Sequence, residues 1–332
     1  MSIPVWFVER VPPTLYSFQP EDATATSPAS KCALEYLNEG GANLVFRISP
    51  DGDRQLPSRL QGRLLRLRKN LSHVPTAEEQ LKALDENFDH LFAPKHLVEH
   101  DLVVLDETLP PLLNGALQQI VRPRHRVGDF LPSEQMSGLL ITDMTPGIGQ
   151  VLLQIKPKWL AQSPTAPPNA KRCRTCALRA QRASERIRTA TDAQETCPFD
   201  FINPGFEQRK AAVQGITADA RLQEYLLDQA QLLLLQLRSY QVAFDKAGVL
   251  KTSGSESIHA LCKAMTLRDC TLFLKRSGDA VEARLGDLDI KLPEKLSKWK
   301  KVESTLLNDG WYTNTESRSI WSGESICALS RT

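Results

Sequence analysis

The sequence predicts an α/β (α+β) protein with two parts, a strand-rich N-terminal part (residues 1–145) and a larger mixed part (146–332). Three observations support this. Short apolar stretches separated by glycine and proline turns dominate the first part, which is typical of strands. Longer segments with helical spacing and one hairpin pattern occupy the second part. The turn-forming sequence TDMTPG at Thr142–Gly147 marks the boundary.

Strand patterns open the first part after a polar segment at 18–31, which we expect to be a loop. Ala33–Leu37 and Leu44–Ile48 are expected to be strands joined by a tight turn at Gly40-Gly41. Gly62–Lys69 alternates arginine with leucine, which is typical of a strand with one buried side and one side facing solvent or a ligand.

One helix is expected within the first part. Thr76 and Glu79 have the spacing of a capping box, and apolar residues at helical spacing follow them. Those residues are Leu81, Leu84, Phe88 and Leu91. Two short buried strands are expected at Val103–Leu105 and Leu139–Ile141.

The second part is expected to begin with a strand at Val151–Ile155. A single long helix over Asp219–Lys246 should follow, closed by Gly248 as its C′ residue and buried because its middle is apolar on nearly all sides. Cys270–Lys275 and Ala280–Leu285 are expected to form a hairpin.

Composition excludes several classes of protein. Lys and Arg number 41 and Asp and Glu 39, so the net charge of +2 excludes a polybasic coat protein and an acidic tail protein. The 41% hydrophobic and 24% charged residues are those of a globular protein rather than a disordered one. Seven cysteines, an odd number in a long chain, indicate reduced thiols in a cytosolic or nuclear compartment. We expect no membrane segment, because no apolar run approaches about 20 residues.

Three aspartates flank the predicted hairpin. Asp269 precedes its first strand, and Asp287 and Asp289 follow its second. Because the open end of a hairpin brings its two strands together, these carboxylates should converge. Carboxylate oxygens bind Mg²⁺, and one carboxylate can act as a base. The structural alternative is a turn rich in Asp.

Basic residues gather at two places in the second part. Lys156 and Lys158, in QIKPKW, follow a strand two residues apart, so both should point the same way. The segment Lys171–Arg188 carries seven positive residues against one negative, which indicates an anion site. The alternative is that the basic residues at both places are simply solvated at the surface and bind no anion. A nucleic-acid site is disfavoured, because aromatic residues are sparse in the basic segment.

The glycine turn within EGGANLVFR (Glu39–Arg47) has backbone amides that can bind phosphate, although an ordinary hairpin turn has the same composition. The patterns GxxxxGK[ST] and GxGxxG are absent, as are the protein-kinase HRD and DFG signatures.

Cys173 and Cys176 form one C-x-x-C pair, which supplies half of a zinc site. Cys197 is a candidate third ligand, with His125 or His259 as a fourth. The alternative is a pair of buried free thiols.

Taken in order, these motifs resemble the inositol-pentakisphosphate 2-kinase family. The matching pieces span Gly40 to Lys291 and are EGGANLVFR, LLRLRK, RPRHR, QIKPKW, the Cys-rich basic segment, CPFDF, MTLRDCTLFL and DLDIK. The resemblance implies two lobes distantly like those of a protein kinase, with ATP and the active site between them. The reaction it implies is transfer of the ATP γ-phosphate to the 2-hydroxyl of inositol 1,3,4,5,6-pentakisphosphate, which gives inositol hexakisphosphate (phytate).

The resemblance also implies roles for individual residues. Lys156 would stabilise the transferring phosphoryl group, and Asp269 would orient or deprotonate the 2-hydroxyl. Asp287 would hold Mg²⁺, with Asp269 as a second candidate ligand. The residues implied for ATP are Gly40, Gly41, Ala42, Asn43, Arg66, Asp143 and Met144. The residues implied for the inositol phosphate are Lys158, Lys291 and Lys295, together with Arg122 or Arg126 and with Lys171 or Arg172.

The expected cofactors are ATP and Mg²⁺, with a structural Zn²⁺ if the cysteines hold one. The expected partners are the small-molecule substrates alone, with no membrane and no nucleic acid, and we expect a monomer. A location in the nucleus, besides the cytoplasm, is implied by the resemblance only. Two alternatives stay open. One is an inositide kinase of different positional specificity, and the other is a non-catalytic protein that binds inositol phosphate or RNA. The paired carboxylates Asp269 and Asp287 favour a kinase, because a protein that only binds polyanions gains nothing from two acidic groups in its site.

Overall fold

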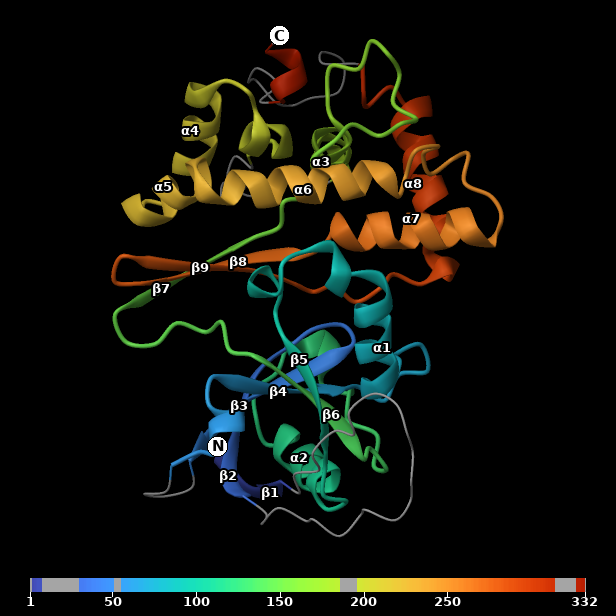
Figure 1. Ribbon diagram of the computed structural model, residues 1–332. Coiled ribbons are helices and arrows are strands. Elements are labelled where there is room, and N and C mark those ends of the chain that lie inside the picture. Colours follow the sequence, from blue (N-terminus) through green and yellow to red (C-terminus); the bar gives the residue numbers. More distant parts are fainter. Residues whose placement is uncertain (1, 8–29, 51–54, 186–195, 314–326, 332) are drawn as a thin grey trace. The chain divides into compact units, whose positions relative to one another are not determined.

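The chain divides into two compact units, Met1–Met144 (unit 1) and Thr145–Thr332 (unit 2). The computed structural model (Figure 1) describes residues 2–7, 30–50, 55–185, 196–313 and 327–331. Most of the predicted loop at 18–31, and Arg186 and Arg188 of the basic segment, lie outside these residues. Within the described residues the protein is a mixed α/β structure with two antiparallel sheets and eight α-helices, as expected.

Unit 1 is built on a six-stranded antiparallel sheet with the strand order β1-β2-β3-β4-β6-β5. Its strands are β1 (Ser2–Phe7), β2 (Ser30–Glu39), β3 (Asn43–Pro50), β4 (Arg63–Arg68), β5 (His100–Val104) and β6 (Ser137–Thr142). The strands predicted on both sides of the glycine turn are confirmed as β2 and β3. Strand β1, which pairs with β2, was not predicted.

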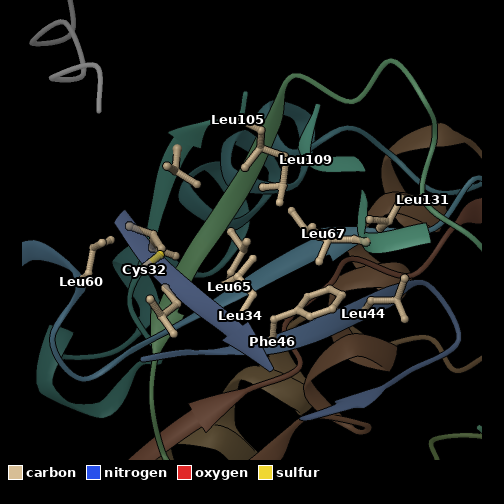
Figure 2. Packing of buried hydrophobic residues seen from close by; sticks show 14 of the residues in the cluster. Cys32, Leu34, Leu44, Phe46, Leu60, Leu65, Leu67, Leu105, Leu109 and Leu131 are labelled. Carbon is tan, nitrogen blue, oxygen red and sulfur yellow. The ribbon is translucent and has the colours of Figure 1, made fainter. Parts of the chain in front are cut away.

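One face of this sheet carries the main core of unit 1 (Figure 2). Alternation on β4 points Leu65 and Leu67 into this core, and Leu105 and Leu109 reach it from the segment that opens α2 (Leu109–Leu117). Arg66 lies between the two leucines in sequence, so it lies on the opposite face of the strand. The predicted alternation is confirmed from Leu65 to Arg68, whereas Leu64, on the same side as Arg66, is also buried.

The predicted capping box opens α1 (Ala77–Asn87). The Glu79 amide donates to Thr76 Oγ1 at 3.2 Å, and the Thr76 amide donates to the Glu79 carboxylate at 2.8 Å. Two donors that the helix leaves unpaired are thereby satisfied. The helix contacts β5 and β6.

Unit 2 combines a three-stranded antiparallel sheet with six helices. Its strands are β7 (Gln150–Ile155), β8 (Thr271–Ser277) and β9 (Ala280–Gly286), in the order β7-β8-β9. Its helices are α3 (Arg174–Glu185), α4 (Phe206–Gln214), α5 (Ala220–Leu227), α6 (Gln229–Ala243), α7 (Ser255–Leu267) and α8 (Leu296–Asn308). The predicted hairpin is confirmed as β8 and β9, and α6 and α7 lie side by side (Figure 1).

Short 3-10 helices complete the described structure of both units. They are Ser58–Leu60, Asp89–Leu91, Pro94–His96, Arg124–Arg126, Pro198–Ile202, Pro293–Lys295 and Ala328–Ser330.

The prediction of one helix over Asp219–Lys246 is wrong. Asp228 has φ −119° and ψ −81°, outside the helical region, and it separates α5 from α6. The Gln231 side chain stabilises this break by donating to the carbonyl of Leu226 at 2.6 Å. A carbonyl at a helix end needs such a partner, and no glycine or proline marks the position in the sequence.

The predicted burial of this apolar segment is also only half right. Leu233 and Leu234 are buried, whereas Leu232 is 77% exposed. Gly248 is not a C′ residue, because α6 ends at Ala243. Over the residues that the structure describes, we find no helix with the length and apolar character that crossing a bilayer requires.

Candidate active site

Four predicted site residues of unit 2 meet at one edge of the three-stranded sheet. Lys156 and Lys158 follow β7, Asp269 precedes β8, and Asp287 follows β9. The antiparallel register pairs the end of β7 with the start of β8, and the start of β8 with the end of β9. Segments more than 100 residues apart in sequence therefore deliver their side chains to one place.

The carboxylate of Asp269 is held by two lysines. Lys158 Nζ lies 3.0 Å from Oδ1, and Lys291 Nζ lies 2.8 Å from Oδ2. Burial alone would raise the pKa of Asp269, but these two ammonium groups outweigh it and hold the pKa at about 2. Asp269 is therefore an ionised hydrogen-bond acceptor at neutral pH.

Lys156 links the two aspartates. Its Nζ donates to the backbone carbonyl of Asp269 at 2.7 Å and lies 3.3 Å from Asp287 Oδ2. The same Asp287 oxygen accepts a hydrogen bond from Thr271 Oγ1, a residue that sequence reasoning missed. Lys158 and Asp287 both have positive φ, 58° and 57°. This conformation is uncommon for residues other than glycine, and strain of this kind concentrates at functional sites.

The cluster suits phosphate and metal chemistry. Its carboxylate oxygens are of the kind that Mg²⁺ prefers as ligands, and the ammonium groups of its lysines attract phosphate. Lys295 extends the positive charge. Partial burial and the nearby ammonium groups of Lys291 and Lys298 lower the pKa of Lys295.

The predicted nucleotide residues lie in unit 1. The turn between β2 and β3 is closed by the Gly40 amide, which donates to the Asn43 carbonyl at 2.8 Å. With its carboxamide oxygen oriented toward Arg66, Asn43 accepts two hydrogen bonds from that side chain, at 3.2 and 2.6 Å. Asp143 donates its amide to Gly62, and Met144 is buried at the end of the unit. Asn43 and Arg66 are thus brought together beside the turn that Gly41 and Ala42 complete.

A buried ion network that the sequence did not indicate supports this turn. Glu39, which precedes the glycines, accepts from Arg122 through both of its carboxylate oxygens at 2.8 Å. Lys69 Nζ lies 2.5 Å from Glu39 and 2.8 Å from Asp129, and its side chain is 0% exposed. Burial would raise the pKa of Glu39, but the hydrogen bonds from Arg122 and Lys69 hold it at about 2.

The structure gives Arg122 a structural role in place of the predicted substrate role. Its side chain is 1% exposed and also donates to the Asp129 carbonyl at 2.7 Å. Arg126 donates to the Glu39 carbonyl at 3.1 Å. A guanidinium buried in this way is closed to a dissolved polyanion, so we leave Arg122 out of the substrate set.

Glu39→Gln is expected to lower the free energy of unfolding by about 3–5 kcal/mol, because it leaves buried cations without their charge partner. Urea unfolding measures the loss. Glu35→Gln on the same strand is the matched control, because Glu35 forms only an exposed pair with Arg47 at 3.8 Å and should cost less than about 1 kcal/mol.

The pH dependence of this contribution follows from the lowered pKa of Glu39. The stabilisation is complete above the unfolded pKa of about 4.3 and is lost as the pH falls toward about 2. Wild type should therefore lose more stability than Glu39→Gln over this range. Equal losses in the two proteins would contradict the assignment.

The start of the basic segment is interior, whereas Lys171 and Arg182 are exposed. Arg172 is buried and donates to the Trp311 carbonyl at 3.3 Å, and burial lowers its pKa. Arg174 is buried and pairs with Glu303 at 3.1 Å. Lys171 is exposed. Of the two residues predicted to bind substrate here, only Lys171 has a side chain open to solution, and Arg172 serves packing.

Four cysteines gather in a second cluster of unit 2. Their Sγ atoms all lie within 4.8 Å of one another, and all four residues are buried: Cys173, Cys176, Cys197 and Cys327. Cys173 Sγ lies 3.8 Å from Cys197 Sγ, which lies 3.9 Å from Cys327 Sγ. None of the four is in a disulfide. The Cys173 amide donates to Cys327 Sγ at 3.1 Å, and hydrogen bonds from the other three thiols lower the pKa of Cys327.

This arrangement fits zinc. Four sulfurs at about 2.3 Å from a tetrahedral Zn²⁺ would be about 3.8 Å apart, which matches the Cys173–Cys197 and Cys197–Cys327 separations of 3.8 and 3.9 Å. The expected third ligand, Cys197, is confirmed as a member of the cluster. The expected histidine is wrong, since the fourth member is Cys327; His125 lies in unit 1 and His259 on α7. Cys173 and Cys176 are buried and in no disulfide, as the alternative of free thiols also expects, but two further buried cysteines lie beside them.

Comparison with known proteins agrees with this geometry. The family model described as inositol-pentakisphosphate 2-kinase matches residues 36–229 and 222–305, well over half of the chain. The chain is similar to a protein of Yarrowia lipolytica (strain CLIB 122 / E 150) named inositol-pentakisphosphate 2-kinase. The two are 28% identical over 295 residues, which cover 83% of this chain and 91% of the relative. The matched ranges include the glycine turn of unit 1 and the lysine–aspartate cluster of unit 2, and the chain therefore belongs to the inositol-pentakisphosphate 2-kinase family.

Proposed function

We propose that this kinase transfers the γ-phosphate of ATP to the 2-hydroxyl of inositol 1,3,4,5,6-pentakisphosphate and forms inositol hexakisphosphate. The observation that carries the proposal is the Asp269 carboxylate, which two lysines hold in a cluster that contains a second carboxylate and a third lysine. Phosphoryl transfer needs positioning and charge neutralisation more than covalent chemistry, and this cluster offers both.

In this proposal Asp269 orients the acceptor hydroxyl. A carboxylate with a pKa of about 2 accepts a hydrogen bond from this hydroxyl group but is a weak base. That suffices for a loose transition state in which the nucleophile loses its proton late. Lys158 and Lys291, which hold Asp269, bind the phosphates of the inositol ring beside that hydroxyl. Lys295, Lys171 and Arg126 complete the proposed substrate set.

Lys156 and Asp287 act on the transferred group. Lys156 donates hydrogen bonds to the phosphoryl oxygens as their charge develops, which acts mainly in the transition state. Asp287, with Thr271 fixing one of its oxygens, would hold Mg²⁺. When bound there, the ion would neutralise phosphate charge. In unit 1, the turn of Gly40, Gly41, Ala42 and Asn43 binds the nucleotide phosphates, with Arg66 beside them and Asp143 and Met144 near adenine.

The four cysteines are proposed to hold a structural Zn²⁺. A site with four protein ligands leaves no position for a substrate or a water molecule, so such an ion stabilises the fold and takes no part in transfer. The apolar residues Phe199, Ala328 and Leu329 pack against the cluster and keep water from it.

ADP release with a panel of inositol phosphates tests the proposal. We expect release with inositol 1,3,4,5,6-pentakisphosphate and none with inositol hexakisphosphate, which has no free hydroxyl. Asp269→Asn should abolish the release. Calorimetric binding without any ADP release would instead support a non-catalytic polyanion binder. Release with other isomers alone would support a kinase of different positional specificity.

Lys291→Ala is expected to raise the KM for the inositol phosphate at least about tenfold and leave the KM for ATP unchanged, because it removes a ground-state phosphate contact. Steady-state kinetics with each substrate varied in turn measure both values. Lys210→Ala, which removes an exposed lysine of α4, is the control and should change neither. Equal effects of Lys291→Ala on both substrates would remove Lys291 from the inositol phosphate site.

A further inference from the structure

The buried side chain of Gln241 holds the loop that carries Lys158. Gln241 lies on α6 and is 0% exposed. Its Oε1 accepts from the Leu160 amide at 3.0 Å, and its Nε2 donates to the Lys158 carbonyl at 2.9 Å. One carboxamide therefore binds the backbone on both sides of Trp159.

The same group reaches the loop that carries Asp269. Gln241 Nε2 also donates to the carbonyl of Leu267 at 3.2 Å, and Leu267 is the last residue of α7, two positions before Asp269. Lys158 and Asp269 are themselves ion-paired at 3.0 Å. The left-handed backbone of Lys158, with φ 58°, needs surrounding contacts that hold it, and the bond to its carbonyl is one.

A second contact from the same end of α6 fixes Arg268, the neighbour of Asp269. Arg268 pairs with Asp245 at 2.7 Å and donates to the Gln241 carbonyl at 3.3 Å. Its guanidinium carbon lies 3.5 Å from the centre of the Trp159 ring. Burial lowers the pKa of Arg268 to about 10, against the opposing effect of Asp245, so it remains charged at neutral pH.

Trp159 is anchored from another helix as well. The guanidinium carbon of Arg174, on α3, lies 4.4 Å from the Trp159 ring centre, and Arg174 is fixed by its pair with Glu303 at 3.1 Å. The residues next to Lys158 and next to Asp269 thus contact each other, and both are tied to helices. A buried polar network in which every group has a partner is rigid and holds one arrangement. Loss of one partner leaves a buried group unpaired and costs free energy of folding.

We infer that Gln241 is a positioning residue for phosphoryl transfer, which sets the backbone of Lys158 and the placement of Asp269 relative to each other. The inference rests on the proposed function, in which these two residues act on the acceptor inositol phosphate. An apolar side chain at 241 would leave the Lys158 carbonyl, the Leu160 amide and the Leu267 carbonyl without this partner. Each loop would then shift to find another, because buried unpaired groups are unfavourable.

Gln241→Met tests the inference, with Thr252→Val as the matched control. Thr252 is also buried, and its side chain donates a hydrogen bond to the Gly248 carbonyl at 3.1 Å, which belongs to neither loop. Misplacing reacting groups by about 1 Å can cost about 100-fold in rate, so we expect kcat to fall by about that factor in Gln241→Met. The KM for ATP should stay within about twofold, and Thr252→Val should keep the wild-type kcat.

Gln241→Glu supplies a second readout and also decides the question if the Met variant does not fold. A neutral carboxyl group can still donate one hydrogen bond to the Lys158 carbonyl, whereas a carboxylate cannot. Burial raises the pKa of a carboxyl group. The kcat of Gln241→Glu relative to wild type should therefore rise as the pH falls from 8 to 6, with both proteins folded by circular dichroism.

Two results would overturn the inference: a folded Gln241→Met whose kcat is within about threefold of wild type, or a Gln241→Glu ratio that does not change with pH. Turnover by wild type and its loss in Asp269→Asn test the proposed function without involving Gln241. A failure of the proposed function is therefore distinguishable from a failure of this inference.

Discussion

Asp287→Asn is expected to lower kcat by about 1,000-fold or more while the protein remains folded. The amide oxygen is a poorer ligand for Mg²⁺ than a carboxylate oxygen. The substitution also removes the negative partner of Lys156 at 3.3 Å, so both charges that act on the transferred phosphate are disturbed. The exposed position of Asp287 keeps the cost in stability small, because exposed pairs contribute little to folding.

Single-turnover kinetics with both substrates saturating measure this loss. Asp279→Asn is the control, because it makes the same replacement of a carboxylate by an amide. Asp279 lies at the turn of the same hairpin, and its side chain is 96% exposed. Its kcat should equal that of wild type. Turnover by Asp287→Asn within about threefold of wild type would remove Asp287 from the mechanism.

Cys327→Ser is expected to cost unit 2 most of its stability and its zinc. Structural zinc sites contribute about 10–16 kcal/mol of apparent binding free energy at pH 7, and this energy counts toward folding. Cys327 lies 130 positions after Cys197 and 154 after Cys173, so the ion would tie distant segments together. Serine is a weak zinc ligand, and loss of one ligand opens the site to chelators.

Zinc content by elemental analysis and the melting temperature measure the two effects. Cys262→Ser is the matched control, since Cys262 is equally buried in unit 2 but lies outside the cluster. It should keep one zinc per chain and lose only the stability expected for a buried hydroxyl. Purified wild type without zinc and with an unchanged melting temperature in chelator would contradict the zinc proposal.

The meeting of Asp269 and Asp287 was predictable because the hairpin between them is local. The turn at Gly278-Asp279 pairs Ser277 with Ala280, and this register fixes the opposite end of the hairpin, where Asp269 and Asp287 lie. A short turn thus determines which carboxylates converge. Lys156 and Lys158 reach them through the pairing of β7 with β8, which joins segments more than 100 residues apart and which no local pattern predicts.

Contacts between distant segments were not predictable from such patterns. The resemblance implied a substrate contact for Arg122, but its partner is Glu39, which lies 83 positions earlier. The fourth cysteine, Cys327, has no spacing relation to Cys173 and Cys176. The break at Asp228 depends on the Gln231 side chain. No glycine or proline in the sequence marks this position. These features depend on tertiary packing, which overrides local preference.

Transfer of labelled phosphate tests the proposed reaction itself. ATP carrying ³²P at the γ-position is incubated with inositol 1,3,4,5,6-pentakisphosphate and the enzyme, and the products are resolved by ion chromatography and by ³¹P NMR. We expect the label in inositol hexakisphosphate, on the 2-position, and none with Asp269→Asn. Label that appears only as inorganic phosphate, or in a pyrophosphate group on the ring, would contradict the proposed function.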